Sequence, residues 1–222
     1  MASLRKLQNF IGGEYRDAVD GRTSTLVNPS TGEGFAEAPV SGQADVDAAM
    51  QAAERGFERW RDATPSERSL ALLRIADKLE ERAEELVRLE TENTGKPFQL
   101  TMDEEVPPAI DQIRFFAGAA RMLNGLSTGE YMAGHTSMIR REPVGVCAQV
   151  TPWNYPFMMA VWKWAPVSRS PQTTLMTPSG RNSLISSAIH TVVTGVVSLG
   201  LRTTALPAAS AGANFHTAIM NG

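Results

Sequence analysis

Apolar residues in the first half of the chain recur every three or four positions, the spacing of helices with one buried face. Three helices are predicted on this basis, over residues 42–60, 64–95 and 107–125. Thr64 and Glu67 form a capping box at the start of the second, with a proline between them at the first helical position. Gly95 stops the second helix, and Pro97 follows it.

Shorter apolar runs bounded by Gly, Asn and Pro predict strands around these helices. Asn9–Tyr15 is typical of a hairpin with a Gly-Gly turn, and Asn28–Glu33 is a turn that leads into a strand over Gly34–Val40. The segment Glu130–Glu142 is predicted to be extended. The apolar run Val144–Val150 predicts a buried strand, so the chain combines helices and strands in an α/β pattern.

The strand Val144–Val150 ends in the polar hexamer Thr151–Pro156, where Asn154 stands between two prolines. Open α/β sheets place ligand chemistry at the carboxyl ends of their strands. A neutral amide in a stiff frame suits the stabilisation of a developing oxyanion. The alternative is a structural turn with a capping asparagine, and the hexamer alone leaves both open. A helix over Phe157–Trp164 is predicted to follow.

Composition narrows the class of protein. The 222 residues are 42% hydrophobic, and the net charge of -3 argues against nucleic acid as the main partner. We find no apolar stretch near the roughly 20 residues of a membrane helix and no signal-peptide core at the start. A cytoplasmic protein is therefore expected. The single cysteine excludes an internal disulfide and a Cys-rich zinc site, and we predict no metal site.

Acidic residues are distributed unevenly along the chain. All 24 lie at or before Glu142, so residues 143–222 contain none. Burial in a strand and a helix explains this for residues 143–166. Burial does not explain the absence of acidic residues from 167–222, because this segment is rich in Ser, Thr, Gly and Pro. An ordinary protein surface mixes both signs of charge.

Six short motifs together resemble the N-terminal part of the aldehyde dehydrogenase superfamily. In chain order they are Asn9–Glu14, Asn28–Glu33, Glu92–Pro97, Phe115–Arg121, Arg141–Val146 and Thr151–Pro156. Each is weak alone, but their order and spacing are similar to those of the family over about residues 8–166. Within the family, the chain is most similar to betaine-aldehyde and aminobutyraldehyde dehydrogenases.

The resemblance implies a fold and a set of partners. It implies an incomplete aldehyde dehydrogenase fold: an N-terminal helical part, the start of a Rossmann-like NAD-binding sheet, and an oligomerisation-type segment at about 130–142, all within residues 1–166. The family oxidises an aldehyde to a carboxylic acid with NAD or NADP and forms homo-oligomers. Asn154 matches its oxyanion-stabilising asparagine, and Thr151, Pro152 and Trp153 match positions that line the dinucleotide site.

The chain departs from the family pattern beyond residue 166. The Lys-Pro-Ser motif expected there, whose lysine contacts the adenosine ribose, is missing, and Lys163 is the last lysine of the chain. Residues 167–222 are therefore expected to be a divergent, irregular tail. Their composition suggests out-of-frame or otherwise foreign sequence.

The family's nucleophile and general base also have no match. Cys147 is the only cysteine, and its place in an apolar strand predicts a buried, inert thiol. The downstream general-base glutamate has no counterpart, since no acid follows Glu142. We therefore predict an inactive, truncated aldehyde dehydrogenase. The alternative is a non-catalytic module that binds a nucleotide or associates with other subunits.

Overall fold

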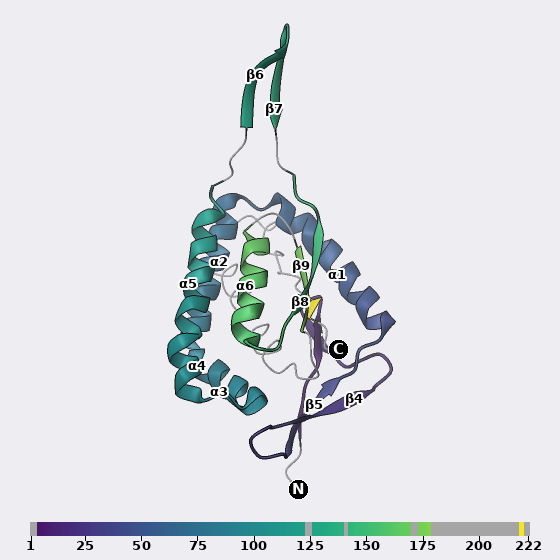
Figure 1. The fold of residues 1–222 in the computed structure, drawn as a ribbon. Coiled ribbons are helices and arrows are strands. Elements are labelled where there is room, and N and C mark those ends of the chain that lie inside the picture. Colours follow the sequence, from purple (N-terminus) through teal and green to yellow (C-terminus); the bar gives the residue numbers. More distant parts are fainter. Residues whose placement is uncertain (1–3, 123–125, 140–141, 170–172, 179–217, 220–222) are drawn as a thin grey trace, which may run out of the picture.

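Two parallel strands lie between helices at the centre of the fold (Figure 1). The computed structural model describes residues 4–122, 126–139, 142–169, 173–178 and 218–219. Strand β8 (Val146–Thr151) pairs in parallel with β9 (Thr173–Pro178). Helix α6 (Pro156–Ser168) and helix α1 (Gln43–Asp62) both pack against this pair. The predicted α/β class is therefore confirmed, with a helix on each side of the strands in Figure 1.

The central pair belongs to a five-stranded sheet of order β3-β2-β10-β9-β8. Strand β10 (Ala218–Ile219) is parallel to β9 and antiparallel to β2 (Asn9–Ile11), which pairs with β3 (Glu14–Arg16). Strands β2 and β3 form the predicted hairpin. Both glycines of its turn have positive φ angles, of 66° and 91°, which is why the turn requires glycine.

A second, three-stranded sheet lies beside the N-terminus, in the order β1-β5-β4. It consists of β1 (Arg5–Lys6), β5 (Gly34–Pro39) and β4 (Thr23–Val27). The predicted turn after β4 is present, because the Asn28 side chain accepts a hydrogen bond from Ser30 N at 2.8 Å. This turn brings Val27 and Pro29 toward the end of helix α3 (Ala83–Thr94), which contributes to the candidate site.

The helix predicted over 64–95 is two helices, α2 (Pro65–Glu81) and α3 (Ala83–Thr94). The chain leaves the helical conformation at Arg82, where φ is -108° and ψ is 16°. The break lets two faces be buried in different directions, because α2 packs against α5 (Val106–Ala119) while α3 packs against α4 (Phe98–Glu104) and α6. Neither the break nor the short helix α4 is predicted by the sequence pattern.

Most of the core lies between α2, α5 and α6. Its fully buried large side chains include Leu72, Ile75, Leu79, Ile113, Phe157 and Val161. The predicted apolar stripes therefore face inward. Both Phe115 and Phe116 are expected from the sequence to pack in the core, but only Phe116 does so, because the side chain of Phe115 is 64% exposed.

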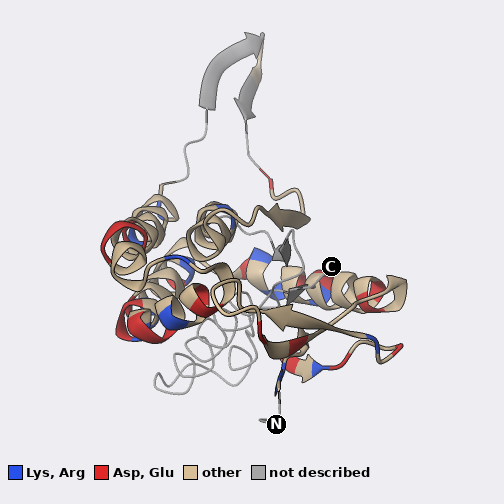
Figure 2. Cartoon of the chain, turned by 60° about the horizontal axis from the view of Figure 1, so that its bottom comes forward, with Lys and Arg blue, Asp and Glu red and all other residues tan. Residues whose placement is uncertain are grey.

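Charged residues are interspersed over the helices and the N-terminal strands (Figure 2). Along α2 and α3 many pair at helical spacing, as in Lys78–Glu81, Arg82–Glu85 and Glu84–Arg88. Such exposed pairs contribute only about 0.3–0.5 kcal/mol each. The charged residues of α2 and α3 thus form a solvated face.

The segment predicted to be extended forms a two-stranded hairpin of β6 (Leu126–Met132) and β7 (His135–Ile139). It extends away from the rest of the chain at the top of Figure 1. Among the described strands, these two pair only with each other. Arg140 and Arg141, for which an anion site and a protective edge charge were the two sequence-based interpretations, lie outside the described residues.

The tail predicted to be irregular contains regular structure where it is described. Strand β9 lies at 173–178 and β10 at 218–219, and both join the central sheet. The prediction failed because β9 has no sequence period of its own. Its strand conformation depends on pairing with β8 over six register positions.

Across the described ranges, no helix combines the length and the apolar character needed to cross a membrane.

Candidate functional site

The predicted loop connects β8 to α6 at the carboxyl end of the central strand pair. Thr151 ends β8 and is buried, while Pro156 begins α6. Proline suits this first helical position because its φ is already helical and its missing N–H would have no partner within the helix. Between them, Pro152 and Asn154 are exposed and Trp153 is half-buried. The structure therefore places all four predicted site residues in one connected segment.

Strand β8 itself is less buried than predicted. Only Thr151 is buried, and the Val150 side chain is 59% exposed. The strand lies at the end of the described sheet order, with β9 on one side. Cys147 is half-buried, so the prediction of a buried core thiol is wrong.

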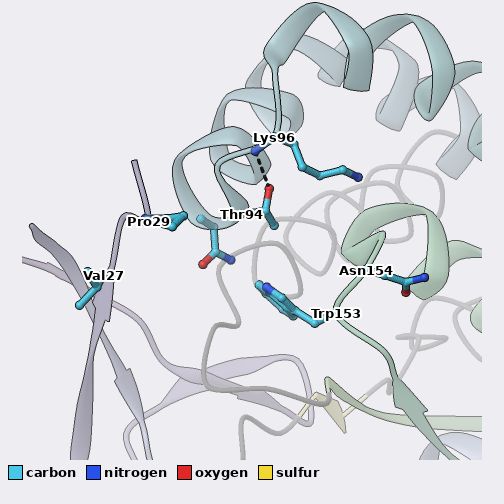
Figure 3. A pocket seen from close by; sticks show the side chains of 7 residues that line it. Val27, Pro29, Thr94, Lys96, Trp153 and Asn154 are labelled. Atoms are coloured by element: carbon cyan, nitrogen blue, oxygen red, sulfur yellow. Dashed lines mark hydrogen bonds between the residues drawn. The ribbon is translucent and has the colours of Figure 1, made fainter. Parts of the chain in front are cut away.

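An open pocket of about 320 Å³ lies beside the loop. Three segments distant in sequence line it: the end of β4, the end of α3 and the β8–α6 loop. The lining residues are Val27, Pro29, Asn93, Thr94, Lys96, Trp153 and Asn154. Figure 3 shows Trp153 and Asn154 projecting in different directions from the loop. Two of the four predicted site residues thus line one pocket.

Gly95 allows the first two segments to meet. It ends α3 in the left-handed conformation, with φ of 74°. A Cβ atom at this position would lie 3.0 Å from Pro29 Cγ and 3.3 Å from Ser30 Oγ. Any other residue would therefore be strained and would push the turn after β4 away from α3.

Asn93 contributes an unusual polar side chain to the pocket. It is 1% exposed, and neither its Nδ2 nor its Oδ1 has a hydrogen-bond partner among the described residues. A buried amide without partners costs about 1–3 kcal/mol. A ligand or a further part of the protein would satisfy both atoms.

A buried charge cluster lies between α3 and the start of α6. The carboxylate of Glu90 is 3.3 Å from Lys96 Nζ, and Lys96 also forms an ion pair with Glu105. The other oxygen of Glu90 accepts a hydrogen bond from Phe157 N at 3.3 Å. Lys96 Nζ lies 4.3 Å from the centre of the Tyr155 ring. The cluster therefore contacts both Tyr155 and Phe157, on either side of Pro156.

Burial, and after it the nearby Glu105 carboxylate, together raise the pKa of Glu90 to about 7. The Lys96 ammonium and the hydrogen bond from Phe157 oppose this rise, because both favour the charged carboxylate. Glu90 therefore changes its charge near neutral pH, where an ordinary glutamate is fully ionised.

Glu90, Asn93 and Lys96 were not predicted as site residues, although residues 92–97 form one of the family-like motifs. The sequence does contain a signal that could have identified Glu90 and Asn93. Glu90 lies four residues after the buried Leu86 and Asn93 lies three after Glu90, so both polar residues continue the buried stripe of α3. Polar residues at buried helical positions are candidates for a functional site.

The donors around the pocket suit a neutral, hydrogen-bonding ligand group. Asn154 and Asn93 are amides, and Lys96 is already paired with two acids. The Phe157 N–H in the first turn of α6 already donates to Glu90, so fewer N–H donors of that helix end remain to bind a phosphate. Within the described residues, no group of three or more His, Cys, Asp or Glu is placed to hold a metal ion.

The chain is similar to known proteins in both sequence and fold. The sequence profile of the aldehyde dehydrogenase family matches residues 15–199. The chain is similar to PnpE in a crystal structure with nicotinamide adenine dinucleotide, with 32% identity and a TM-score of 0.86 over 97% of this chain and 41% of PnpE. A putative aldehyde dehydrogenase from Burkholderia cenocepacia is 31% identical, with the same coverage and TM-score.

The betaine aldehyde dehydrogenase of Staphylococcus aureus, in a complex with NAD⁺, is 28% identical and has a TM-score of 0.85 over 97% of this chain and 40% of that enzyme. The chain thus spans about two-fifths of the length of these proteins. The family match also continues beyond residue 166, so the resemblance extends further than the sequence analysis placed it. This counts against a foreign origin for residues 167–199.

Proposed function

Because the chain belongs to the aldehyde dehydrogenase family, we propose that it provides the oxyanion loop and part of the dinucleotide site of an NAD- or NADP-dependent aldehyde oxidation. The observation that carries this proposal is the position of Trp153 and Asn154. Both lie on the loop at the carboxyl end of β8 and line an open pocket. That is where α/β sheets bind their ligands.

In this proposal Asn154 donates its amide N–H to the carbonyl oxygen of the aldehyde. The side chain is exposed, and prolines at 152 and 156 restrict the backbone on both sides of it. A donor held in place before the reaction stabilises a developing oxyanion without reorganisation, an effect worth about 3–4 kcal/mol in other enzymes. A bound NAD or NADP would accept the hydride, while Thr151, Pro152 and Trp153 would form the wall that orients the nicotinamide.

The chain does not supply the other catalytic groups of the family. Its single cysteine, Cys147, lies within β8 and not on a loop beside Asn154, and no acidic residue follows Glu142. We therefore expect no aldehyde oxidation by this chain alone. The aldehyde class remains a prediction from the sequence resemblance, and a cytoplasmic location remains a prediction from the composition of the chain.

Absorbance at 340 nm tests the catalytic part of the proposal. With NAD or NADP and either betaine aldehyde or aminobutyraldehyde, the chain should form no more reduced dinucleotide than a buffer control. Turnover that persists in Cys147→Ser would show that our account of the missing nucleophile is wrong. Turnover abolished by that substitution would make Cys147 the nucleophile.

Fluorine NMR tests the dinucleotide site directly. The four tryptophans can be labelled with 5-fluorotryptophan and their signals assigned by single Trp→Phe variants. NAD should shift the signal of Trp153, which lines the pocket, and leave that of Trp60 on α1 unchanged. Equal shifts at both, or none at millimolar NAD, would contradict a dinucleotide site at this loop.

A second function, association with other subunits, is supported by the β6–β7 hairpin. It projects from the body, and among the described strands its two outer edges have no partner (Figure 1). Unpaired strand edges readily pair with another chain. Replacing residues 126–139 by a short Gly-Ser linker should lower the mass measured by sedimentation equilibrium. An unchanged oligomeric state would exclude the hairpin as the association surface.

A further inference from the structure

A buried carboxylate anchors the helix that follows the loop carrying Asn154. Glu90 Oε2 accepts a hydrogen bond from Phe157 N, and Phe157 is the second residue of α6. The side chain of Glu90 is 1% exposed, so water does not compete for this contact. Asn154 lies three positions before Phe157 in the chain. A shift of the carboxylate would therefore move the helix start and the loop together.

Lys96 holds this carboxylate in place from the other side. Its ammonium contacts the Oε1 atom of Glu90, pairs with Glu105 and lies over the ring of Tyr155, the last residue of the loop. The loop end is thus held at two adjacent points, by the ring of Tyr155 and the N–H of Phe157. Both points depend on the same Glu90–Lys96 pair.

A purely structural role explains this cluster poorly. Two buried carboxylates share one ammonium, and Glu105 Oε2 has no hydrogen-bond partner among the described residues. Buried charges of this kind usually reduce stability in comparison with a neutral or apolar replacement. Proteins keep such destabilising groups most often at functional sites.

We propose that Glu90 is a positioning residue, held by Lys96, which fixes the Thr151–Pro156 loop and so the direction in which Asn154 presents its amide. The catalytic significance of this amide orientation rests on the proposed function of Asn154. The anchoring of the loop by Glu90 does not depend on that function. The titratable groups that face Glu90 are Lys96, Glu105 on the α4–α5 junction and Tyr155 on the loop. Lys96 also lines the pocket together with Trp153.

The anchor depends on the charge of Glu90. An ionised carboxylate accepts a stronger hydrogen bond from Phe157 N–H and interacts favourably with the N-terminus of α6. Since the pKa of Glu90 is about 7, the loop should be held more tightly above neutral pH than below it. A glutamine at this position keeps an acceptor for Phe157 but cannot titrate.

Hydrogen exchange of the Phe157 amide tests the anchor. In Glu90→Ala the amide should exchange at least about tenfold faster at pH 8, because it loses a charge-assisted hydrogen bond. Glu90→Gln should restore part of the protection. The control is Glu84→Gln on the exposed side of the same helix, which should leave the amide unchanged. Equal protection in wild type and Glu90→Ala, with circular dichroism showing both folded, would overturn the proposal.

The pH profile of Trp153 separates positioning from a structural effect. The 5-fluorotryptophan signal at Trp153 should shift with a midpoint near pH 7 in wild type and stay flat in Glu90→Gln. Lys96→Met should move the midpoint to higher pH, since Lys96 opposes the rise of the Glu90 pKa. Replacing all three histidines of the chain by glutamine should leave the midpoint in place. A midpoint that survives in Glu90→Gln would refute the assignment.

These measurements do not require the proposed function to be correct. If the loop is anchored by Glu90 but NAD leaves the Trp153 signal unchanged, only the dinucleotide site fails. If NAD shifts Trp153 equally in wild type and Glu90→Ala, and the Phe157 amide is equally protected, only the anchor fails. If both hold, Glu90→Ala should weaken NAD binding about tenfold or more, in proportion to the lost amide protection.

Discussion

Replacing Glu90 by glutamine should remove most of the pH dependence of stability between pH 5 and 8. In the folded chain the pKa of Glu90 is about 7, against an ordinary value of 4.5, mainly because burial disfavours its charged form. The folded state therefore holds a proton that the unfolded state has released. Stability from this group is fully present below pH 4.5 and is lost as the pH rises through 7.

The size of the effect follows from the difference in pKa. At about 1.4 kcal/mol per pKa unit, a rise from 4.5 to about 7 corresponds to roughly 3 kcal/mol. This is a large part of the 5–15 kcal/mol that typically stabilises a domain. Wild type should thus be clearly less stable at pH 8 than at pH 5, whereas Glu90→Gln should be nearly level between the two.

Urea unfolding followed by circular dichroism at pH 5, 6, 7 and 8 measures this difference. The exposed, ion-paired carboxylates Asp17, Asp20 and Glu80 have lowered pKa values, so they are ionised throughout this range and do not contribute to the slope. Glu84→Gln is the matched control and should follow the wild-type curve. Parallel curves for wild type and Glu90→Gln would refute the reasoning, because the slope would then arise from other groups.

The other predictions concern the frame of the pocket and the helices that support it. Gly95→Ala should destabilise the chain by about 1 kcal/mol or more in urea unfolding, because its φ is 74° and the added Cβ meets Pro29 at 3.0 Å. Gly118→Ala on α5, where a Cβ meets nothing within 4 Å, should instead be neutral or stabilising, and a loss equal to that at Gly95 would contradict this account. Thr64→Ala should cost about 1 kcal/mol, since the Thr64 side chain accepts from Glu67 N at 3.3 Å and caps α2. No change in the urea midpoint of Thr64→Ala would show that this cap does not contribute.

The candidate site could be predicted only in part. The strand–loop–helix order around Asn154 follows from local signals: an apolar run, two prolines and an apolar helix. The cluster of Glu90, Lys96 and Glu105 does not, because its members are 6 to 15 residues apart and meet only after α3 ends at Gly95. Charged residues in a sequence are usually exposed. The sequence therefore does not distinguish this cluster from the solvated pairs on α2 and α3, and only its burial in the folded chain does.

Local chemistry in the sequence determined the elements that need no distant partner. The capping box at Thr64, the glycine turn between β2 and β3, the apolar stripes and the loop at Asn154 all lie where the residues predict them. Tertiary structure decided the rest. Strand β9 exists through pairing with β8, the break at Arg82 lets α2 and α3 bury different faces, and the ionisation of Glu90 depends on burial beside Glu105. Pairing, packing and desolvation are properties of segments brought together, so no local pattern records them.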